Sequence, residues 1–161
     1  MIEQGWIVEA RKYIGTKEVP GVKHSPLILS WWKKIKRGGI KSDEVPWCAA
    51  FVGAMLEESG LVSSRFESAK SYLTWGERLS KPLYGCIVVF ARNSGGHVGF
   101  VVGKDATGRL MVLGGNQGDK VSVVPFSVDR VAGYRWPKAA LFTGAELPLL
   151  ASTAAASTNE A

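Results

Sequence analysis

The sequence predicts an α+β fold in which helices form first and an antiparallel sheet follows. Before Pro82, apolar residues recur at helical spacing in segments that end at glycines. After Pro82, short runs rich in valine, isoleucine and aromatic residues alternate with turns that contain Gly and Asn. The chain has 161 residues, which is enough for one domain with its own core.

The helical half begins with a predicted helix over residues 2–14, which Gly15 follows. Ser25 and Pro26 predict the start of a second helix, because serine caps a helix and proline fits its first position. Residues 68–79 are expected to form a short fourth helix whose inward side chains are Tyr72, Leu73 and Trp75.

The third helix is predicted to carry a cysteine in its first turn. Pro46 suits that turn, and Asp43 and Glu44 place negative charge near the positive end of the helix dipole. Free N–H groups and the dipole would stabilise a Cys48 thiolate there, although a small buried core residue is the alternative interpretation. The predicted apolar face consists of Cys48, Phe51, Val52, Met55 and Leu56, and Gly60 ends the helix.

The second half of the chain is predicted to form a meander of about five antiparallel strands. A Gly-rich turn over 93–96 and a hairpin loop over 104–108 separate the first three of them. We therefore expect one domain over residues 1–140, followed by an Ala/Ser/Thr-rich tail over 141–161 that is flexible. The predicted strands are 86–90, 97–102, 109–113, 121–124 and 131–136.

The formal net charge of +6 favours anionic partners. A basic cluster at residues 33–37 is interpreted as a solvated helix end, and no nucleic-acid-binding signature accompanies it. No apolar run approaches the roughly 18 residues that a membrane span needs, and the N-terminus does not read as a secretory signal. We expect neither nucleic-acid binding nor stable membrane insertion, and a monomer.

The two cysteines, Cys48 and Cys86, do not make a disulfide framework, and His24 and His97 are the only histidines. No spacing of these residues is typical of a zinc site, so no metal and no other cofactor is expected. His24 precedes a helix cap and is interpreted as an exposed loop residue.

A thiol nucleophile needs a base, and the base needs an orienting group. His97 opens a strand after glycines, so it is the candidate base, with a satisfied strand histidine as the alternative. Asn116 ends the next strand and is expected to lie across the hairpin from His97, where its side-chain oxygen would fix the imidazole tautomer. A turn asparagine is the alternative for Asn116, and Gln117 and Asp119 are neighbouring candidates for the same role.

Cysteine, histidine and asparagine in this order, with the cysteine at a helix start, form a papain-like arrangement. Gly96 would leave room for substrate backbone beside the base. Trp47 either lines the cleft or anchors the helix in the core. The candidate site therefore has catalytic residues Cys48, His97 and Asn116, and substrate-binding residues Trp47, Gly96 and Gln117.

Several segments resemble the CHAP and NlpC/P60 superfamily of peptidoglycan-cleaving cysteine hydrolases, most closely the small CHAP-like proteins of phage lysis genes. The resemblance covers roughly residues 5–138. It implies a papain-like fold with Cys48 as nucleophile, His97 as base and Asn116 as orienting residue. The segments that carry it are residues 13–21, 45–52, 68–76, 87–90, 97–103, 112–119 and 133–137.

The chain departs from the family pattern at three places. Cys86 replaces an expected aspartate and is predicted to be a buried, inert thiol. Some CHAP domains carry a glutamate at the position of Gly114, and its absence leaves the orienting role to Asn116. Some also bind calcium before the cysteine, but Asp43 and Glu44 supply too few oxygens for such a site.

The resemblance implies cleavage of an amide bond in the peptide part of bacterial peptidoglycan, either the N-acetylmuramoyl–L-alanine amide or a stem or cross-bridge peptide bond. An endolysin would be made in the host cytoplasm and reach the wall after holin-type release. A secreted antibacterial amidase effector would use the same chemistry. Other interpretations are a non-catalytic wall-binding or structural virion module on this fold, and a transglutaminase-like or deubiquitinating enzyme.

Overall fold

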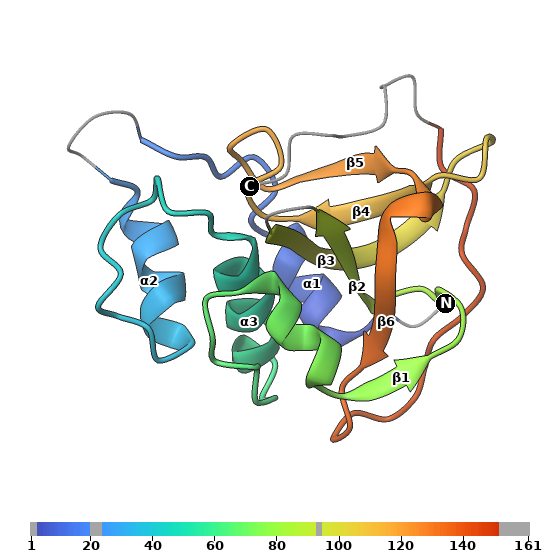
Figure 1. Ribbon diagram of the computed structural model, residues 1–161, viewed down its shortest axis with the longest axis horizontal. Coiled ribbons are helices and arrows are strands. Elements are labelled where there is room, and N and C mark those ends of the chain that lie inside the picture. The colour runs from blue at the N-terminus through green and yellow to red at the C-terminus, as the bar shows by residue number, and fades with distance from the viewer. Residues whose placement is uncertain (1–2, 20–23, 93–94, 152–161) are drawn as a thin grey trace.

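The computed structural model describes residues 3–19, 24–92 and 95–151 and has the predicted α+β class (Figure 1). Its helical segments are α1 (Gly5–Arg11), α2 (Pro26–Lys34), α3 (Cys48–Glu58) and the 3₁₀ segments η1 (Ala69–Thr74) and η2 (Val128–Arg130). Its strands are β1 (Glu77–Leu79), β2 (Ile87–Arg92), β3 (Gly95–Lys104), β4 (Leu110–Gly114), β5 (Ser122–Phe126) and β6 (Val131–Trp136).

The six strands form one antiparallel sheet in the order β1-β6-β2-β3-β4-β5. The predicted hairpin between β3 and β4 is confirmed, because Gly108 N–H donates to the Asp105 carbonyl over 3.0 Å. Burial alone would raise the pKa of the Asp105 carboxyl, but hydrogen bonds from Thr107 and Arg109 lower this pKa to about 2. The turn is therefore held by a carboxylate that stays ionised.

The predicted start of the second helix is confirmed. Ser25 is the N-cap of α2, and its hydroxyl accepts from the Ile28 N–H over 3.3 Å, with Pro26 at the first helical position. Helix α1 is shorter than predicted, because the chain turns after Arg11 and Gly15 adopts a φ of +98°.

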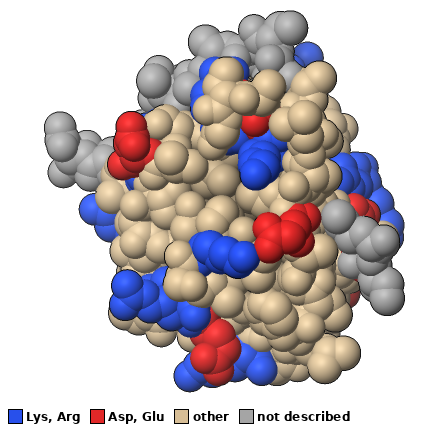
Figure 2. Space-filling model, turned by 90° about the vertical axis from the view of Figure 1, so that its right-hand side faces the viewer, with Lys and Arg blue, Asp and Glu red and all other residues tan. Residues whose placement is uncertain are grey.

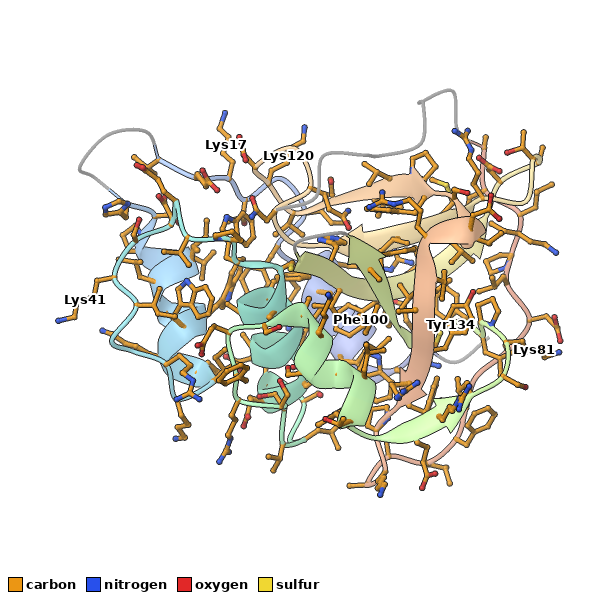
Figure 3. The ribbon with its side chains drawn as sticks, in the orientation of Figure 1. Lys17, Lys41, Lys81, Phe100, Lys120 and Tyr134 are labelled. Atoms are coloured by element: carbon orange, nitrogen blue, oxygen red, sulfur yellow. The ribbon has the colours of Figure 1, made fainter. Side chains whose placement is uncertain are left out.

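Helix α3 is buried on all sides over residues 48–56, so it has no solvent-facing stripe there. It packs against α1, α2, β3 and β4, and its Phe51 ring lies 6.4 Å from that of Phe100 on β3 (Figure 3). The helix ends as predicted at Gly60, which has a φ of +87°. Gly60 N–H donates to Glu57 and Leu61 N–H donates to Leu56, which together form a Schellman motif.

The predicted helix over residues 68–79 is wrong in its second half. Trp75 is extended, and Gly76 turns the chain with a φ of +71° into strand β1, which pairs with β6. A Cβ on Gly76 would lie 2.5 Å from the Trp136 carbonyl oxygen, so this close approach requires glycine. The sheet therefore has one strand more than the sequence predicted.

The expected tail over residues 141–161 is ordered in its first part. Tyr84 N–H donates to the Ala145 carbonyl over 2.8 Å, and Lys104 N–H donates to the Pro148 carbonyl over 2.9 Å. Leu147 and Leu150 pack on the core. Residues 141–151 are therefore bound to the domain by backbone hydrogen bonds and apolar contact, whereas 152–161 lie outside the described residues.

The face at the right-hand end of Figure 1 carries basic and acidic side chains next to one another (Figure 2). Two ion pairs of the domain, Lys81–Glu146 and Arg109–Asp105, show the same mixing of charge. None of the helices in the described part of the chain is long and apolar enough to cross a membrane.

Candidate active site

Cys48 is the first residue of helix α3, as the sequence predicts, and its side chain is buried. The residue before it, Trp47, is the N-cap and gives no side-chain hydrogen bond to the first turn. No acidic side chain lies in that turn either. The helix therefore begins without a competing side-chain oxygen, in a setting that favours negative charge on a thiol or a substrate oxygen.

Of the two acidic residues before α3, Asp43 is held by hydrogen bonds to the preceding loops. Asp43 is fully buried in the preceding loop, where its carboxylate accepts from the Val19 and Ser25 N–H groups over 2.8 and 2.7 Å. The Nδ1 atom of His24 lies 2.9 Å from the same carboxylate. Burial would raise the pKa of Asp43, but the His24 contact and the two N–H donors hold it below its usual value.

His24 is consequently not the exposed loop residue that the sequence predicts. Its side chain is 22% exposed and paired with Asp43, which joins the loop before α2 to the loop before α3. Because its ring nitrogen is engaged in that pair, His24 has a structural position at the entrance to both helices.

The sequence left open whether Trp47 lines the cleft or anchors the helix in the core. The structure shows the second, because Trp47 is buried. It has no exposed surface, and its Nε1–H donates to Glu18 over 2.9 Å. Its ring lies 5.7 Å from that of Trp31 on α2. A Cβ on Gly115 would approach the Trp47 ring to 2.8 Å, so the loop after β4 packs directly on the start of α3.

His97 lies on β3, opposite Phe90 of β2, and is fully buried. Its ring stacks on Phe126 at 5.3 Å and 15°, and on Phe90 at 6.3 Å and 23°. Two aromatic rings therefore fix the plane of the imidazole.

Gln117 makes the polar contact that fixes the imidazole within that plane. Its Oε1 lies 2.9 Å from the Nε2 of His97, while its own Nε2 donates to the carbonyls of Val112 and Ser122 over 3.1 and 2.9 Å. Carbonyl oxygens only accept, so the amide nitrogen of Gln117 faces them and its oxygen faces His97. A neutral His97 must then carry its proton on Nε2, which makes Nδ1 the basic nitrogen.

Asn116 does not hold the position that the sequence assigned to it. The β3–β4 register pairs Phe100 with Leu113, and its continuation would set Asn116 opposite His97. Strand β4 ends at Gly114 instead, and Asn116 turns the chain with a φ of +59°. Its Oδ1 is buried and makes no hydrogen bond to any described residue, so Gln117, one residue later, contacts the histidine.

The sequence contains a signal for this exchange in Gly114. A Cβ at this position would lie 2.3 Å from the Oε1 of Gln117 and 3.5 Å from the Nε2 of His97. The missing side chain therefore leaves the space in which the Gln117 amide meets the imidazole. Where some CHAP domains carry a glutamate, this chain has a glycine and a glutamine three residues later.

Gly96 has a packing role where the sequence suggested room for substrate. A Cβ there would lie 2.9 Å from the Phe90 carbonyl oxygen and 3.2 Å from the Cγ of Lys70, so the lysine stem crosses the strand at this point.

Cys86 is fully buried, and burial raises the pKa of its thiol to about 12, in keeping with the predicted inert thiol. No group of three or more metal-ligating side chains occurs in the described residues.

One comparison with known protein families gives a match that overlaps the candidate site. Residues 40–116 match the family model of the CHAP domain. The match includes Cys48 and His97 and ends one residue before Gln117. No curated protein shows a significant match to the chain. CHAP domains are generally hydrolases of the cysteine or amidase type that act on peptidoglycan. Residues 40–116 therefore match a CHAP domain, and CHAP domains belong to the NlpC/P60-like group of cysteine peptidases and amidases.

Proposed function

We propose that this protein hydrolyses an amide bond in the peptide part of peptidoglycan by a thiol mechanism. Cys48 is the nucleophile, His97 the acid and base, and Gln117, in place of Asn116, the residue that orients the imidazole. The observation that carries the proposal is the fixed Gln117 amide, because it sets the tautomer that leaves Nδ1 of His97 to exchange a proton with a thiol.

The reaction begins with the Cys48 thiolate and the His97 imidazolium. The sulfur attacks the carbonyl carbon, and N–H groups at the start of α3 stabilise the oxyanion. The C–N bond breaks as His97 gives its proton to the leaving amine. His97 then takes a proton from water, the hydroxide attacks the thioester, and the thiolate leaves with the carboxylate product free.

Stacking supports the second role of His97. The Phe126 and Phe90 rings hold the imidazole on both the acid and the base step without supplying a competing hydrogen-bond partner. Because the proton moves through Nδ1 while Nε2 stays bonded to Gln117, the ring does not have to rotate between the steps. The mechanism needs no metal.

The experiment that tests the proposal uses the two cysteines as a matched pair. Purified sacculi are treated with wild type, Cys48→Ala and Cys86→Ala, turbidity is followed, and released fragments are identified by mass spectrometry. We expect clearing by wild type and by Cys86→Ala, none by Cys48→Ala, and new amine and carboxyl termini that identify the bond. Binding of all three proteins to sacculi without clearing or new termini would make the chain a wall-binding module.

For its biological setting, we propose an endolysin-like role in which the protein is made in the host cytoplasm and reaches the wall after holin-type release. The support is the similarity to small CHAP-like lysis proteins. Expression in a bacterial host with and without a holin tests this: lysis that requires both genes supports it. Delivery by a secretion apparatus with a neighbouring immunity gene would instead indicate an antibacterial effector.

A further inference from the structure

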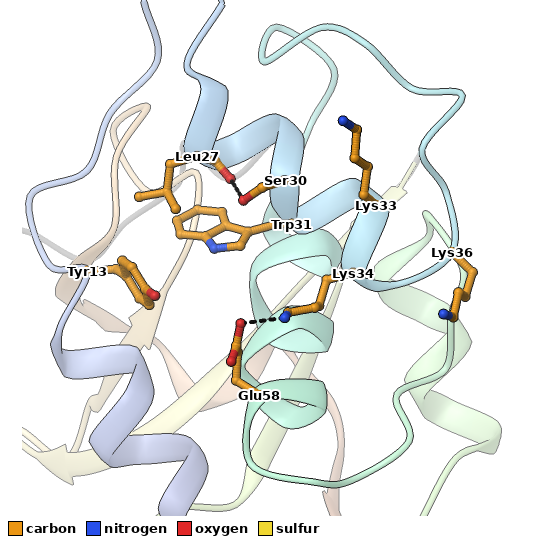
Figure 4. A pocket seen from close by; sticks show the side chains of 8 residues that line it. All are labelled: Tyr13, Leu27, Ser30, Trp31, Lys33, Lys34, Lys36 and Glu58. Carbon is orange, nitrogen blue, oxygen red and sulfur yellow. Dashed lines mark hydrogen bonds and ion pairs between the residues drawn. The ribbon is translucent and has the colours of Figure 1, made fainter.

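A groove of about 350 Å³ runs along α2, between Tyr13 after α1 and Glu58, the last residue of α3 (Figure 4). Tyr13 and Trp31 form an edge-to-face pair on its lining, with ring centres 5.5 Å apart. Its volume is at the lower end of the range for ligand sites, roughly 300–1,000 Å³. The groove is therefore large enough for one or two units of a polymer. Its charged lining residues are Lys33, Lys34, Lys36 and Glu58.

The charge of the groove is positive and only partly neutralised. Lys34 pairs with Glu58, the one acidic residue of the lining, at 2.7 Å. Lys33 and Lys36 form no ion pair with any described residue. Figure 4 shows the amines of Lys33 on α2 and Lys36 just after it pointing in different directions, so each is left to meet a separate anionic group of a ligand.

The backbone of Lys36 has a left-handed conformation, which is the conformation that glycine adopts most readily. Its φ is +65°, and it occupies the position after the C-cap of α2. Lys36 N–H donates to Lys33 and Arg37 N–H donates to Trp32, which is the same Schellman motif that ends α3. At α3 the corresponding residue is Gly60. A lysine in the left-handed region costs about 1–2 kcal/mol, so its presence at the rim of a groove calls for a functional reason.

We propose that this groove is a second binding site, for an anionic segment of the cell-wall polymer. Its ligand chemistry is carboxylate or phosphate groups of the polymer, one contacting Lys33 and another contacting Lys36, with a further polymer unit against Tyr13. Helix α3 has 11 residues, and the steps from Cys48 to Glu58 give a rise of about 15 Å at 1.5 Å per residue. The Glu58 end of the groove thus lies away from the bond being cut, whereas its Trp31 wall extends to the Trp47 ring beside Cys48. The identity of the polymer rests on the proposed function.

The test measures binding in a Cys48→Ala background, so that the sacculi stay intact. Lys33→Gln/Lys36→Gln removes two charges from the groove, and Lys104→Gln/Lys120→Gln removes two exposed charges that do not line it. A lysine near an anionic surface contributes about fivefold in affinity, so the groove variant should bind sacculi roughly 10- to 30-fold more weakly at low salt. Equal losses in both double variants would overturn the site and leave only non-specific attraction.

Two sources of negative charge are separated by the sacculus preparation. Sacculi are compared before and after hydrofluoric acid extraction, which removes phosphodiester-linked polymers. A difference between the variants that survives extraction identifies carboxylates of the peptidoglycan, and one that disappears identifies polymer phosphate. Phosphatidylglycerol vesicles are the third arm: a larger variant effect on vesicles than on sacculi would contradict a wall site.

Activity measurements keep this inference separate from the proposed function. With Cys48 intact, the groove variant should cleave a small soluble stem-peptide fragment as fast as wild type, but clear sacculi more slowly because KM rises. If wild type cleaves neither substrate, the hydrolase proposal fails. The binding of the Cys48→Ala variants to sacculi still tests the groove as a binding site in that case. If the groove variant loses activity on the small fragment as well, the groove is not a separate site.

Discussion

The two ends of helix α3 have opposite environments. Around its start, Glu18 and Asp43 are tied to Trp47, His24 and backbone N–H groups. At its end, Lys34 of α2 pairs with Glu58 beside the groove that Lys33 and Lys36 also line. The N-terminal end is buried and hydrogen-bonded, which suits a reaction that needs fixed geometry. The C-terminal end is hydrated and basic, which suits the reversible retention of a polymer.

The charges at the two ends follow the helix dipoles. Acidic side chains lie near the positive start of α3, and lysines lie at the negative end of α2. Burial raises the pKa of Glu18, although the Trp47 N–H opposes that shift, and the Asp119 and Asp43 charges add to it. Electrostatics at the Cys48 end are therefore set by buried contacts, whereas those at the groove end are set by exposed charges that salt screens.

The largest expected effect is at the catalytic end and concerns the residue that orients His97. Gln117→Leu should lower kcat by about 10²- to 10⁴-fold with KM nearly unchanged, because the imidazole loses its fixed tautomer. Asn116→Gly keeps a left-handed backbone and should cost far less. Steady-state kinetics on a soluble stem peptide check both. The opposite ranking would return the orienting role to Asn116.

The second effect is on stability and concerns the buried carboxylate before α3. Asp43→Ala leaves the buried Ser25 N–H and the partly buried Val19 N–H without their acceptor and should lower the free energy of unfolding by about 2–4 kcal/mol. Glu44→Ala, at the exposed neighbouring carboxylate, is the control. Chemical denaturation at pH 7 measures both, and equal stability of Asp43→Ala and wild type would contradict the structural role.

The same comparison has a defined pH dependence. The pKa of Asp43 is lowered by folding, so its contribution is complete above the unfolded value of about 3.9 and is lost as pH falls through the folded value. The stability gap between wild type and Asp43→Ala should therefore be constant near neutral pH and narrow below about pH 4. A gap that narrows as pH rises would contradict this sign.

The smallest expected effect is at the groove end. There, one substitution of Lys36 should raise the stability of the protein while it weakens binding to sacculi. Lys36→Gly relieves a left-handed lysine but increases the entropy of the unfolded chain, so we expect a net gain of about 0.5–1 kcal/mol and a Tm rise of about 1–4 °C. The same variant should bind sacculi more weakly. Lys120→Gly removes an equal charge without a positive φ to relieve, and should not raise Tm.

The sequence by itself determined features that depend on neighbours within about four residues. It placed Cys48 at a helix start, Ser25 at a cap, Gly60 at a helix end and His97 on a strand, because caps, left-handed glycines and apolar spacing are local signals. It also indicated the α+β class, because the helical pattern before Pro82 and the strand pattern after it each extend over about half of the chain.

Tertiary structure decided the contacts that join distant segments. Gln117 and not Asn116 contacts His97, because β4 ends at Gly114 and the left-handed turn at Asn116 changes the direction of the side chains that follow. No local sequence pattern determines where that strand ends. Trp47 became a buried anchor through Glu18, 29 residues away. Residues 141–151 joined the domain through backbone hydrogen bonds, which any sequence can make. Burial and register arise only when the whole sheet assembles, and they determined which polar group faces His97.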